Sequence, residues 1–442
     1  MTHDYHWPDD VYSWGQNRLG SFVPLVAQLF YKGLGLSALW SESLTHYLIL
    51  LVGCLAFVSF FRSNSLKIIF AFLWFFAPIR FVDLTQLYFG VHYSLLAIAC
   101  FLFWHSKAQK RGLKNLYLFF TVTALIAAVW VSDMAIISVA VLLLTQVCFY
   151  LKSNNISLET FKRLELYYAL GGLLLGILFI HYCKEIAVSK YDYTQLATLE
   201  QLEGTMDILL LSLKQLLLFQ NNEIPTSIYC WLLIALLLFI LPQFKLSFTN
   251  PLRVFFFLEA LVLLGAILST EYTFLNNVPR RYFTCAYISL SFSFLLFIDE
   301  FQKSMKFIKS IKMLIFITVL VGGLGALYQL KYIWPGTLEP HANNIAQYEK
   351  LGESGIIAEY WNSYVSCATH PNLIKATPHD KTGSVLNVKM IDEVFKQKNI
   401  YVIKDMWLEA YPDTMEQFGR LLKKDGDEFI LGGTSFCKYI LK

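Results

Sequence analysis

The chain has 442 residues, of which 56% are apolar, 16% aromatic and only 15% charged. Soluble proteins carry about a quarter charged residues, and the deficit here lies before residue 334, so an ordinary soluble enzyme is excluded. A net charge of +4, with no basic run interleaved with stacking aromatics, does not indicate nucleic-acid binding.

Apolar runs long enough, or nearly long enough, to cross a hydrocarbon layer of about 30 Å recur through the first three quarters of the chain. They predict membrane helices at 44–61, 66–82, 84–104, 116–131, 133–150, 166–183, 226–241, 254–270, 282–299 and 313–333. The predicted fold is an α-helical polytopic membrane protein of about 10 spans. Its predicted parts are a first outer segment (1–43), a transmembrane domain (44–333) and a tail (334–442).

Lysine and arginine gather in alternate loops, which the positive-inside rule assigns to the cytoplasm. These residues are Lys107, Lys110, Arg111, Lys114, Lys152, Lys162, Arg163, Lys303, Lys306, Lys309 and Lys312. The first segment, the loops at 184–225 and 271–281, and the tail then fall on the extracytoplasmic face. Residues 1–20 have no apolar stretch typical of a secretory signal, yet this orientation requires them to be translocated. We therefore expect a further span before residue 1, with unaided transfer of a short N-terminus as the alternative.

The tail changes to short β-rich runs separated by polar helical stretches, a pattern typical of a small α/β domain. Strands are predicted at 355–358, 373–377, 400–403 and 428–431, and helices at 388–397 and 414–423. Gly432-Gly433 is interpreted as a turn between two strands. Cys367 and Cys437 either form a disulfide in an oxidising compartment or are two unrelated buried thiols.

Ionisable residues persist at the predicted outer ends of the spans, where burial near lipid makes them costly. They are Asp9, Asp10, Arg80, Asp83, Asp133, Glu271, Arg280 and Arg281. Simple solvation accounts for each alone, and Arg80 and Asp83 can pair at a helix boundary. Together they suggest a carboxylate acting as general base on a hydroxyl, with arginine holding a phosphate leaving group.

A few polar or small residues lie inside the predicted spans. Glu259 and His92 are either functional groups or structural hydrogen-bonding partners between helices. Gly172 and Gly176 form a GxxxG pattern that predicts a close helix–helix approach.

The opening stretch, residues 9–21 (Asp-Asp-Val-Tyr-Ser-Trp-Gly-Gln-Asn-Arg-Leu-Gly-Ser), resembles a known loop. It is similar to the first extracytoplasmic loop of bacterial integral-membrane glycosyltransferases of the GT-C fold, which include protein mannosyltransferases and lipid A aminoarabinose transferases. The spans, an amphipathic stretch at 22–40 and the small extracytoplasmic domain are similar to that architecture.

The resemblance implies roles for particular residues. Asp9 or Asp10 would be the general base or a ligand for a divalent cation, and Asp133 a second acidic position. Arg280, Arg281 and Tyr282 resemble a basic-aromatic site that contacts the lipid-linked phosphate. Tyr12, Gly15, Arg18 and Gly20 complete the first-loop motif.

The implied activity is an inverting transfer of sugar from a polyprenyl-phosphate donor to a glycan, lipid or protein acceptor. It would take place at the outer face of the bacterial plasma membrane. Two alternatives remain at this point. One is a polytopic transporter or flippase for lipid-linked saccharides, for which internal repeats would be expected. The other is a non-catalytic envelope assembly protein that binds glycan through its tail.

Overall fold

The structure is a computed structural model that describes residues 2, 5–78, 90–153, 164–189, 194–220, 224–240, 249–302, 307–329, 343–380 and 387–442. The chain forms two compact units. The helical unit contains residues 1–7, 18–183 and 192–330, and the α/β unit contains residues 8–17, 184–191 and 331–442. The first-loop motif is therefore divided between the two units.

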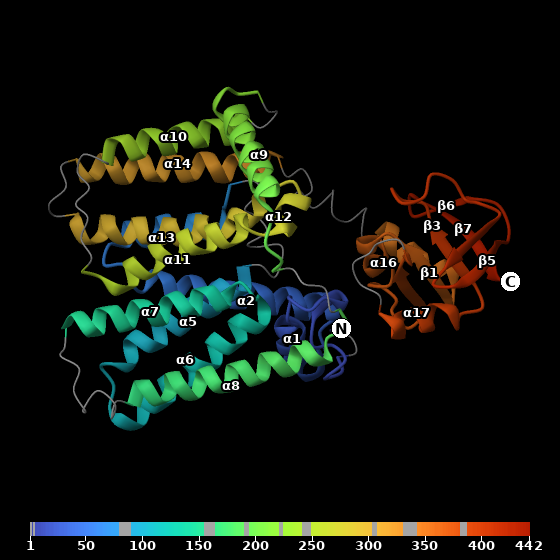
Figure 1. Cartoon of the computed structure of the whole chain (residues 1–442), viewed down its shortest axis with the longest axis horizontal. Coiled ribbons are helices and arrows are strands. Elements are labelled where there is room, and N and C mark those ends of the chain that lie inside the picture. Colours follow the sequence, from blue (N-terminus) through green and yellow to red (C-terminus); the bar gives the residue numbers. More distant parts are fainter. Residues whose placement is uncertain are drawn as a thin grey trace. The chain divides into compact units, whose positions relative to one another are not determined.

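Apolar helices make up the helical unit, and the longer ones lie side by side in Figure 1. Their bounds are α1 Phe22–Leu34, α2 Ala38–Val58, α3 Asn64–Phe75, α5 Val91–Ser106, α6 Arg111–Val131, α7 Ala135–Ser153, α8 Leu164–Ile186, α9 Leu199–Leu217, α10 Ile224–Ile240, α11 Pro251–Leu268, α12 Glu271–Leu275, the 3-10 helix η5 Arg280–Phe283, α13 Thr284–Phe301 and α14 Ile308–Gln329. Among the described residues, seven helices are long and apolar enough to cross a membrane: α2, α6, α7, α8, α11, α13 and α14.

Each of the ten predicted spans coincides with one of these helices. Three of them, α3, α5 and α10, have only 12, 16 and 17 residues, so the count of ten spans stays a prediction. Arg80 and Asp83 lie outside the described residues. The predicted loop at 184–225 contains α9, whose Thr198 side chain caps its first turn. Because charged residues interrupt α9, it does not stand out as an apolar run.

The predicted amphipathic stretch at 22–40 is divided between two helices. α1 ends at Leu34 with Gly35 as its cap, and α2 already begins at Ala38. The Ser37 hydroxyl accepts a hydrogen bond from the Trp40 backbone N–H at 3.3 Å, which explains the early start of α2.

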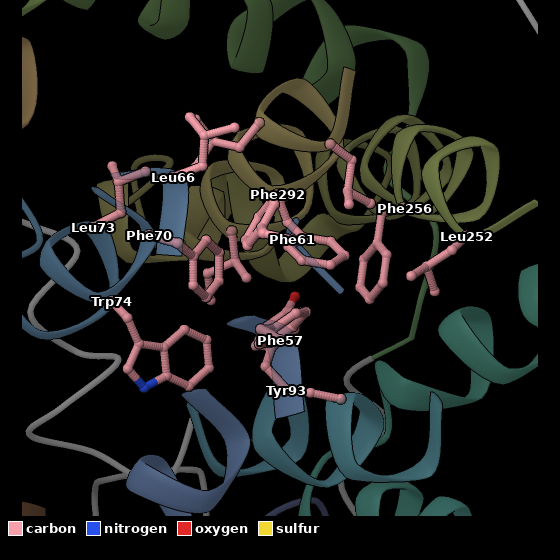
Figure 2. Packing of buried hydrophobic residues seen from close by; sticks show 14 of the residues in the cluster. Phe57, Phe61, Leu66, Phe70, Leu73, Trp74, Tyr93, Leu252, Phe256 and Phe292 are labelled. Atoms are coloured by element: carbon pink, nitrogen blue, oxygen red, sulfur yellow. The ribbon is translucent and has the colours of Figure 1, made fainter. Parts of the chain in front are cut away.

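Aromatic side chains form the centre of the helical core (Figure 2). The Phe57 ring of α2 is fully buried, and its centroid lies 5.1 Å from that of Phe70, 4.7 Å from Phe292 and 5.5 Å from Phe256. These rings come from α3, α13 and α11. Ring pairs at these distances and angles stabilise the core by close packing.

The GxxxG pattern of α8 lies against α6, as predicted. A Cβ added at Gly172 would be 2.6 Å from Val122 Cγ1, and one at Gly176 would be 3.4 Å from Ile126 Cγ1. Elsewhere α8 buries few of its apolar side chains within the helical unit. The two glycines therefore mark the surface by which α8 packs.

The α/β unit contains a mixed sheet (Figure 1). Its strand order is β2-β1-β3-β7-β5-β4, and β6 also pairs with β7. The strands are β1 Ser354–Ala358, β2 Ile374–Pro378, β3 Ile400–Ile403, β4 Thr414–Gln417, β5 Arg420–Lys424, β6 Phe429–Leu431 and β7 Thr434–Leu441. β1 is parallel to β2 and to β3, and the remaining pairs are antiparallel. The helices α16 Tyr360–Ser366 and α17 Val388–Phe395 connect the parallel strands.

Most predicted tail elements are confirmed. β1, β2, β3, β6 and α17 coincide with predicted elements, and the turn at Gly432-Gly433 joins β6 to β7 with φ of 57° and 74°. The helix predicted at 414–423 is wrong, because this stretch is the β4–β5 hairpin. Phe418 and Gly419, at φ of 55° and 71°, make the tight turn. The burial of β4 alternates, as in a strand with one face inward.

The two tail cysteines are both unbridged. Cys437 packs with Ile357 in the cluster on one face of the sheet, whereas Cys367 packs with the cluster that contains Ile356, on the other face. Neighbouring residues of a strand point to opposite faces. The sheet thus separates the thiols, and the disulfide considered from the sequence does not form here.

Candidate functional site

The second half of the first-loop motif belongs to the helical unit and is fixed by two contacts. Arg18 Nη2 donates a hydrogen bond to the Tyr272 hydroxyl at 3.0 Å, and its guanidinium carbon lies 4.7 Å from the centroid of that ring. The Gly20 backbone N–H donates to the Trp130 carbonyl oxygen at 3.0 Å. A Cβ at Gly20 would lie 2.3 Å from this oxygen, so the close approach requires glycine. The segment therefore lies between α12 and the end of α6.

Tyr272 also connects Arg18 to the predicted basic-aromatic site. Its ring centroid lies 6.2 Å from that of Tyr282. Tyr282 belongs to η5, the short 3-10 helix that begins at Arg280. A cation over an aromatic ring contributes about 0.5–2 kcal/mol. The structure thus places a third arginine, Arg18, beside the stretch that contains Arg280 and Arg281. The side chains of those two arginines lie outside what the structure describes.

The backbone is strained just before the 3-10 helix η5. Asn277 and Val278 have φ of 55° and 48°, and a β-branched residue rarely adopts a left-handed conformation. The buried Val278 holds it through a hydrogen bond from its N–H to the Thr273 carbonyl oxygen at 3.0 Å. Strain of this kind concentrates where a structure positions functional groups, which supports 277–283 as part of a site.

Asp133 lies in the turn between α6 and α7, three positions after Trp130. One of its carboxylate oxygens is buried, and its backbone carbonyl accepts the Ile136 N–H at 3.0 Å. Trp130 is itself packed, with ring centroids of Trp7 and Phe179 each 5.7 Å away. Asp133, Gly20 and Arg18 therefore belong to one end of the helical unit.

The acidic half of the motif belongs to the α/β unit. Asp9 Oδ2 accepts a hydrogen bond from Lys389 Nζ at 2.9 Å, and both side chains are exposed. This hydrogen bond raises the pKa of Lys389 above its ordinary value, and the charge of Asp10 adds to the effect. Tyr12 is buried, and Gly15 ends the 3-10 turn that begins at Ser13.

The predicted site residues are thus separated by the fold into two groups. Arg18, Gly20, Asp133 and Tyr282 are brought together in the helical unit, whereas Asp9, Asp10, Tyr12 and Gly15 lie in the α/β unit. The partners Tyr272, Trp130 and Lys389 were not predicted. Tyr272 directly follows Glu271 in the predicted outer loop, and this position was the one signal in the sequence that could have identified it.

A divalent cation requires several oxygen or nitrogen ligands converging on one point. In the described part of the chain, no three His, Cys, Asp or Glu side chains gather in this way. Asp9 is also engaged by an ammonium group. The described residues do not fit a metal centre, and we assign no step to a cation.

Glu259 of α11 is fully buried in the helical unit. The Ser138 hydroxyl of α7 donates to its Oε1 at 2.7 Å, and Ser289 and Tyr93 lie beside it. This arrangement is a polar connection between helices in an apolar interior.

Neither a protein family nor a curated protein matches the chain.

Proposed function

We propose that the chain is an inverting glycosyltransferase of the bacterial plasma membrane that uses a polyprenyl-phosphate sugar at the extracytoplasmic face. One observation carries the proposal: Arg18 of the opening motif is bonded to Tyr272, which lies beside Tyr282 of the basic-aromatic motif. The first-loop motif and the basic-aromatic motif each resemble a part of the glycosyltransferase family, and they are neighbours here although they are far apart in sequence. The apolar helices and the small α/β unit support the same reading.

In this proposal the arginines bind the donor. Arg280 or Arg281, with Arg18 nearby, pairs with the phosphate oxygens, because a guanidinium stays charged near lipid and matches a phosphate with two hydrogen bonds. Asp9 or Asp10 removes the proton of the acceptor hydroxyl. The hydroxyl oxygen bonds to the anomeric carbon as the bond from that carbon to the phosphate oxygen breaks. Polyprenyl phosphate leaves with the electron pair, and the acceptor is glycosylated with inversion.

The proposal is tested with the full chain in lipid nanodiscs and a radiolabelled polyprenyl-phosphate sugar, with release of polyprenyl phosphate as the readout. We expect the double variant Asp9→Asn, Asp10→Asn to lose activity by about 10²- to 10⁴-fold, the usual contribution of general base catalysis. Asp425→Asn is the matched control, because Asp425 is paired with Lys438 in the same unit but is remote from the motif in sequence. Full activity in the double variant with an unchanged fold would contradict the proposal.

The donor site is tested separately. Arg18→Ala should raise KM for the donor more than it lowers kcat, since a phosphate contact is made in the ground state and the transition state alike. Tyr272→Phe, which keeps the ring and removes the hydroxyl, should have a smaller effect of the same kind. Arg420→Ala, in which an arginine paired with Asp392 of the α/β unit is removed, should leave KM unchanged.

A transporter or flippase for lipid-linked saccharides is the second candidate, and Glu259 favours it. A fully buried carboxyl among apolar helices often marks a proton or substrate pathway. This candidate predicts movement of the lipid-linked sugar between leaflets without bond cleavage, and its loss in Glu259→Gln. Sugar transfer with no leaflet exchange would reject it.

A further inference from the structure

The helix α9 (Leu199–Leu217) crosses the end of the helical unit instead of running alongside its long helices. Figure 1 shows it transverse to α10 and α14. Before its start, the Ala197 backbone N–H donates to the carbonyl oxygen of Ser269, the residue after α11, at 2.9 Å. At its other end, Trp231 Nε1 of α10 donates to the Leu217 carbonyl oxygen at 3.0 Å. The helix therefore joins the end of α11 to the first half of α10.

One side of α9 is packed against the helical unit. Gln201 Nε2 donates to Glu271 Oε1 of α12 at 3.0 Å, and Thr205 is buried. A Cβ added at Gly204 would lie 2.6 Å from Phe274 Cε2, so glycine allows α9 and α12 to approach closely. These contacts fix the rotation of α9 about its own axis, and they decide which of its side chains face outward.

The outward side of α9 is divided lengthwise into an apolar flank and a polar flank. With 3.6 residues per turn, positions 199, 206, 210 and 213 fall on one line along the helix. This apolar flank is between 49% and 81% exposed and consists of Leu199, Met206, Leu210 and Leu213. The polar flank beside it consists of exposed charged residues at a similar spacing: Glu200, Glu203, Asp207 and Lys214. A helix with one packed, one apolar and one charged side is typical of the boundary between a bilayer and water.

The surroundings of α9 indicate lipid as the partner of its apolar flank. Trp231 is about half exposed while its N–H is bonded to the end of α9. An indole with a bonded N–H and a partly exposed ring is typical of the level of the lipid headgroups. The helix α11, which α9 contacts at its other end, is long and apolar enough to cross a membrane, whereas α9 has 19 residues and is not apolar enough.

We propose that α9 lies in the interface of one leaflet, parallel to the bilayer plane, and binds the lipids of that leaflet through its apolar flank. Acyl chains cover this flank, and the charges of the polar flank stay in water or among the headgroups. Under the predicted orientation of the loop at 184–225, this is the outer leaflet. Since α9 packs on α12, the contact also fixes the depth at which Tyr272 and its partner Arg18 lie.

The charges of α9 specify which lipids it needs. The helix contains three carboxylates and one ammonium group, so attraction to anionic headgroups does not hold it at the membrane. Burial of apolar area does, and the long stem of Lys214 carries its charge to the headgroups. The contact is therefore expected with neutral lipid alone, and it does not depend on the proposed sugar transfer.

The test measures contact with lipid and with water at single positions of the full chain in phosphatidylcholine nanodiscs. A nitroxide is attached to p-acetylphenylalanine at each position, so that the eight native cysteines stay unchanged. Power saturation compares collisions with oxygen, which concentrates in hydrocarbon, and with a water-soluble nickel chelate. We expect oxygen collisions to dominate at Leu210 and nickel collisions to dominate at Asp207, three positions before it.

Two controls set the scale. Leu175, an exposed residue in the middle of the candidate span α8, reports full contact with lipid. Glu409, an exposed residue of the α/β unit, reports contact with water. The ratio of oxygen to nickel collisions at Leu210 should lie below that at Leu175 and well above that at Glu409. Met206 and Glu203 repeat the comparison on the same two flanks, so that one position that disturbs folding does not decide the result.

Each other outcome overturns a stated part of the proposal. Dominant nickel collisions at Leu210 and Met206 would place α9 in water. Weak collisions with both reagents at these positions would mean that protein, such as a second copy of the chain, covers the apolar flank. Dominant oxygen collisions at Asp207 and Glu203 as well would place the whole helix in hydrocarbon. A ratio at Leu210 that rises only when phosphatidylglycerol replaces part of the neutral lipid would show that charge, and not apolar burial, holds α9.

Discussion

Replacing Gly20 by alanine tests how the opening motif is held in the helical unit. The added Cβ would lie 2.3 Å from the Trp130 carbonyl oxygen and 2.6 Å from Trp130 Cδ1. Neither contact can persist, so the Gly20–Trp130 hydrogen bond must break or the Trp130 ring must move. Overpacking costs about 1–3 kcal/mol and a lost hydrogen bond about 0.5–1.5 kcal/mol.

A second effect of the Gly20→Ala substitution stabilises the protein, and it is smaller than this loss. Glycine to alanine reduces the freedom of the unfolded chain and contributes about 0.4–1 kcal/mol where the backbone permits it. We therefore expect Gly20→Ala to be destabilised by a net ~1–3 kcal/mol. Because Arg18 is two residues away, the variant should also lose the proposed sugar transfer.

The assay is thermal unfolding of the full chain in detergent micelles, followed by intrinsic fluorescence. Gly33→Ala on α1 is the matched control, since a Cβ there meets no heavy atom within 4 Å and the helix gains propensity. Its midpoint should equal or exceed that of the wild type. If Gly20→Ala unfolds at the same temperature as Gly33→Ala, the close approach to Trp130 is not a constraint and this reasoning is refuted.

Three further predictions concern other parts of the chain. Gly172→Leu on α8 should lower the unfolding midpoint because its side chain would enter the space of Val122, whereas Gly171→Leu, with open space around it, should not. Glu259→Ala should destabilise the helical unit by about 2–5 kcal/mol through a cavity and an unbonded Ser138 hydroxyl, and Glu259→Gln should be milder in the same thermal assay. Burial raises the pKa of Tyr411 from 10.0 to about 12, so its neutral phenol contributes stability that is complete below pH 10 and is lost as the pH rises to about 12. Alkaline unfolding followed by circular dichroism should therefore show a steeper loss in this interval for the wild type than for Tyr411→Phe.

Local properties of the sequence account for most of the elements. A helix in an apolar solvent must satisfy its own backbone and present apolar side chains over its length, so the runs that became α2, α6 and α13 are visible without a structure. The α/β unit was predicted from its alternating short strands and helices and from the turn signal of the glycine pair at 432–433. The first-loop motif and the arginine pair were also visible as patterns of residues.

Other features depend on contacts between distant parts of the chain. The stretch 414–423 has the composition of a polar helix, and it becomes a hairpin because β5 pairs with β7 and the turn residues adopt positive φ. The helix α9 was not predicted, because charged residues interrupt its sequence and it does not form a continuous apolar run. In the hairpin the local propensity is weak, and tertiary pairing decides the outcome.

The sequence alone determined that a charge-poor helical region precedes a small α/β tail, and that acidic and basic motifs occur in the segments predicted to be outside. Only the tertiary structure decided how the opening motif is divided between the two units. It assigns Asp9 and Asp10 to the α/β unit through Lys389 and Tyr360, and Arg18 and Gly20 to the helical unit through Tyr272 and Trp130. These contacts join residues hundreds of positions apart, and no local pattern specifies them, because they arise only when the whole chain has packed.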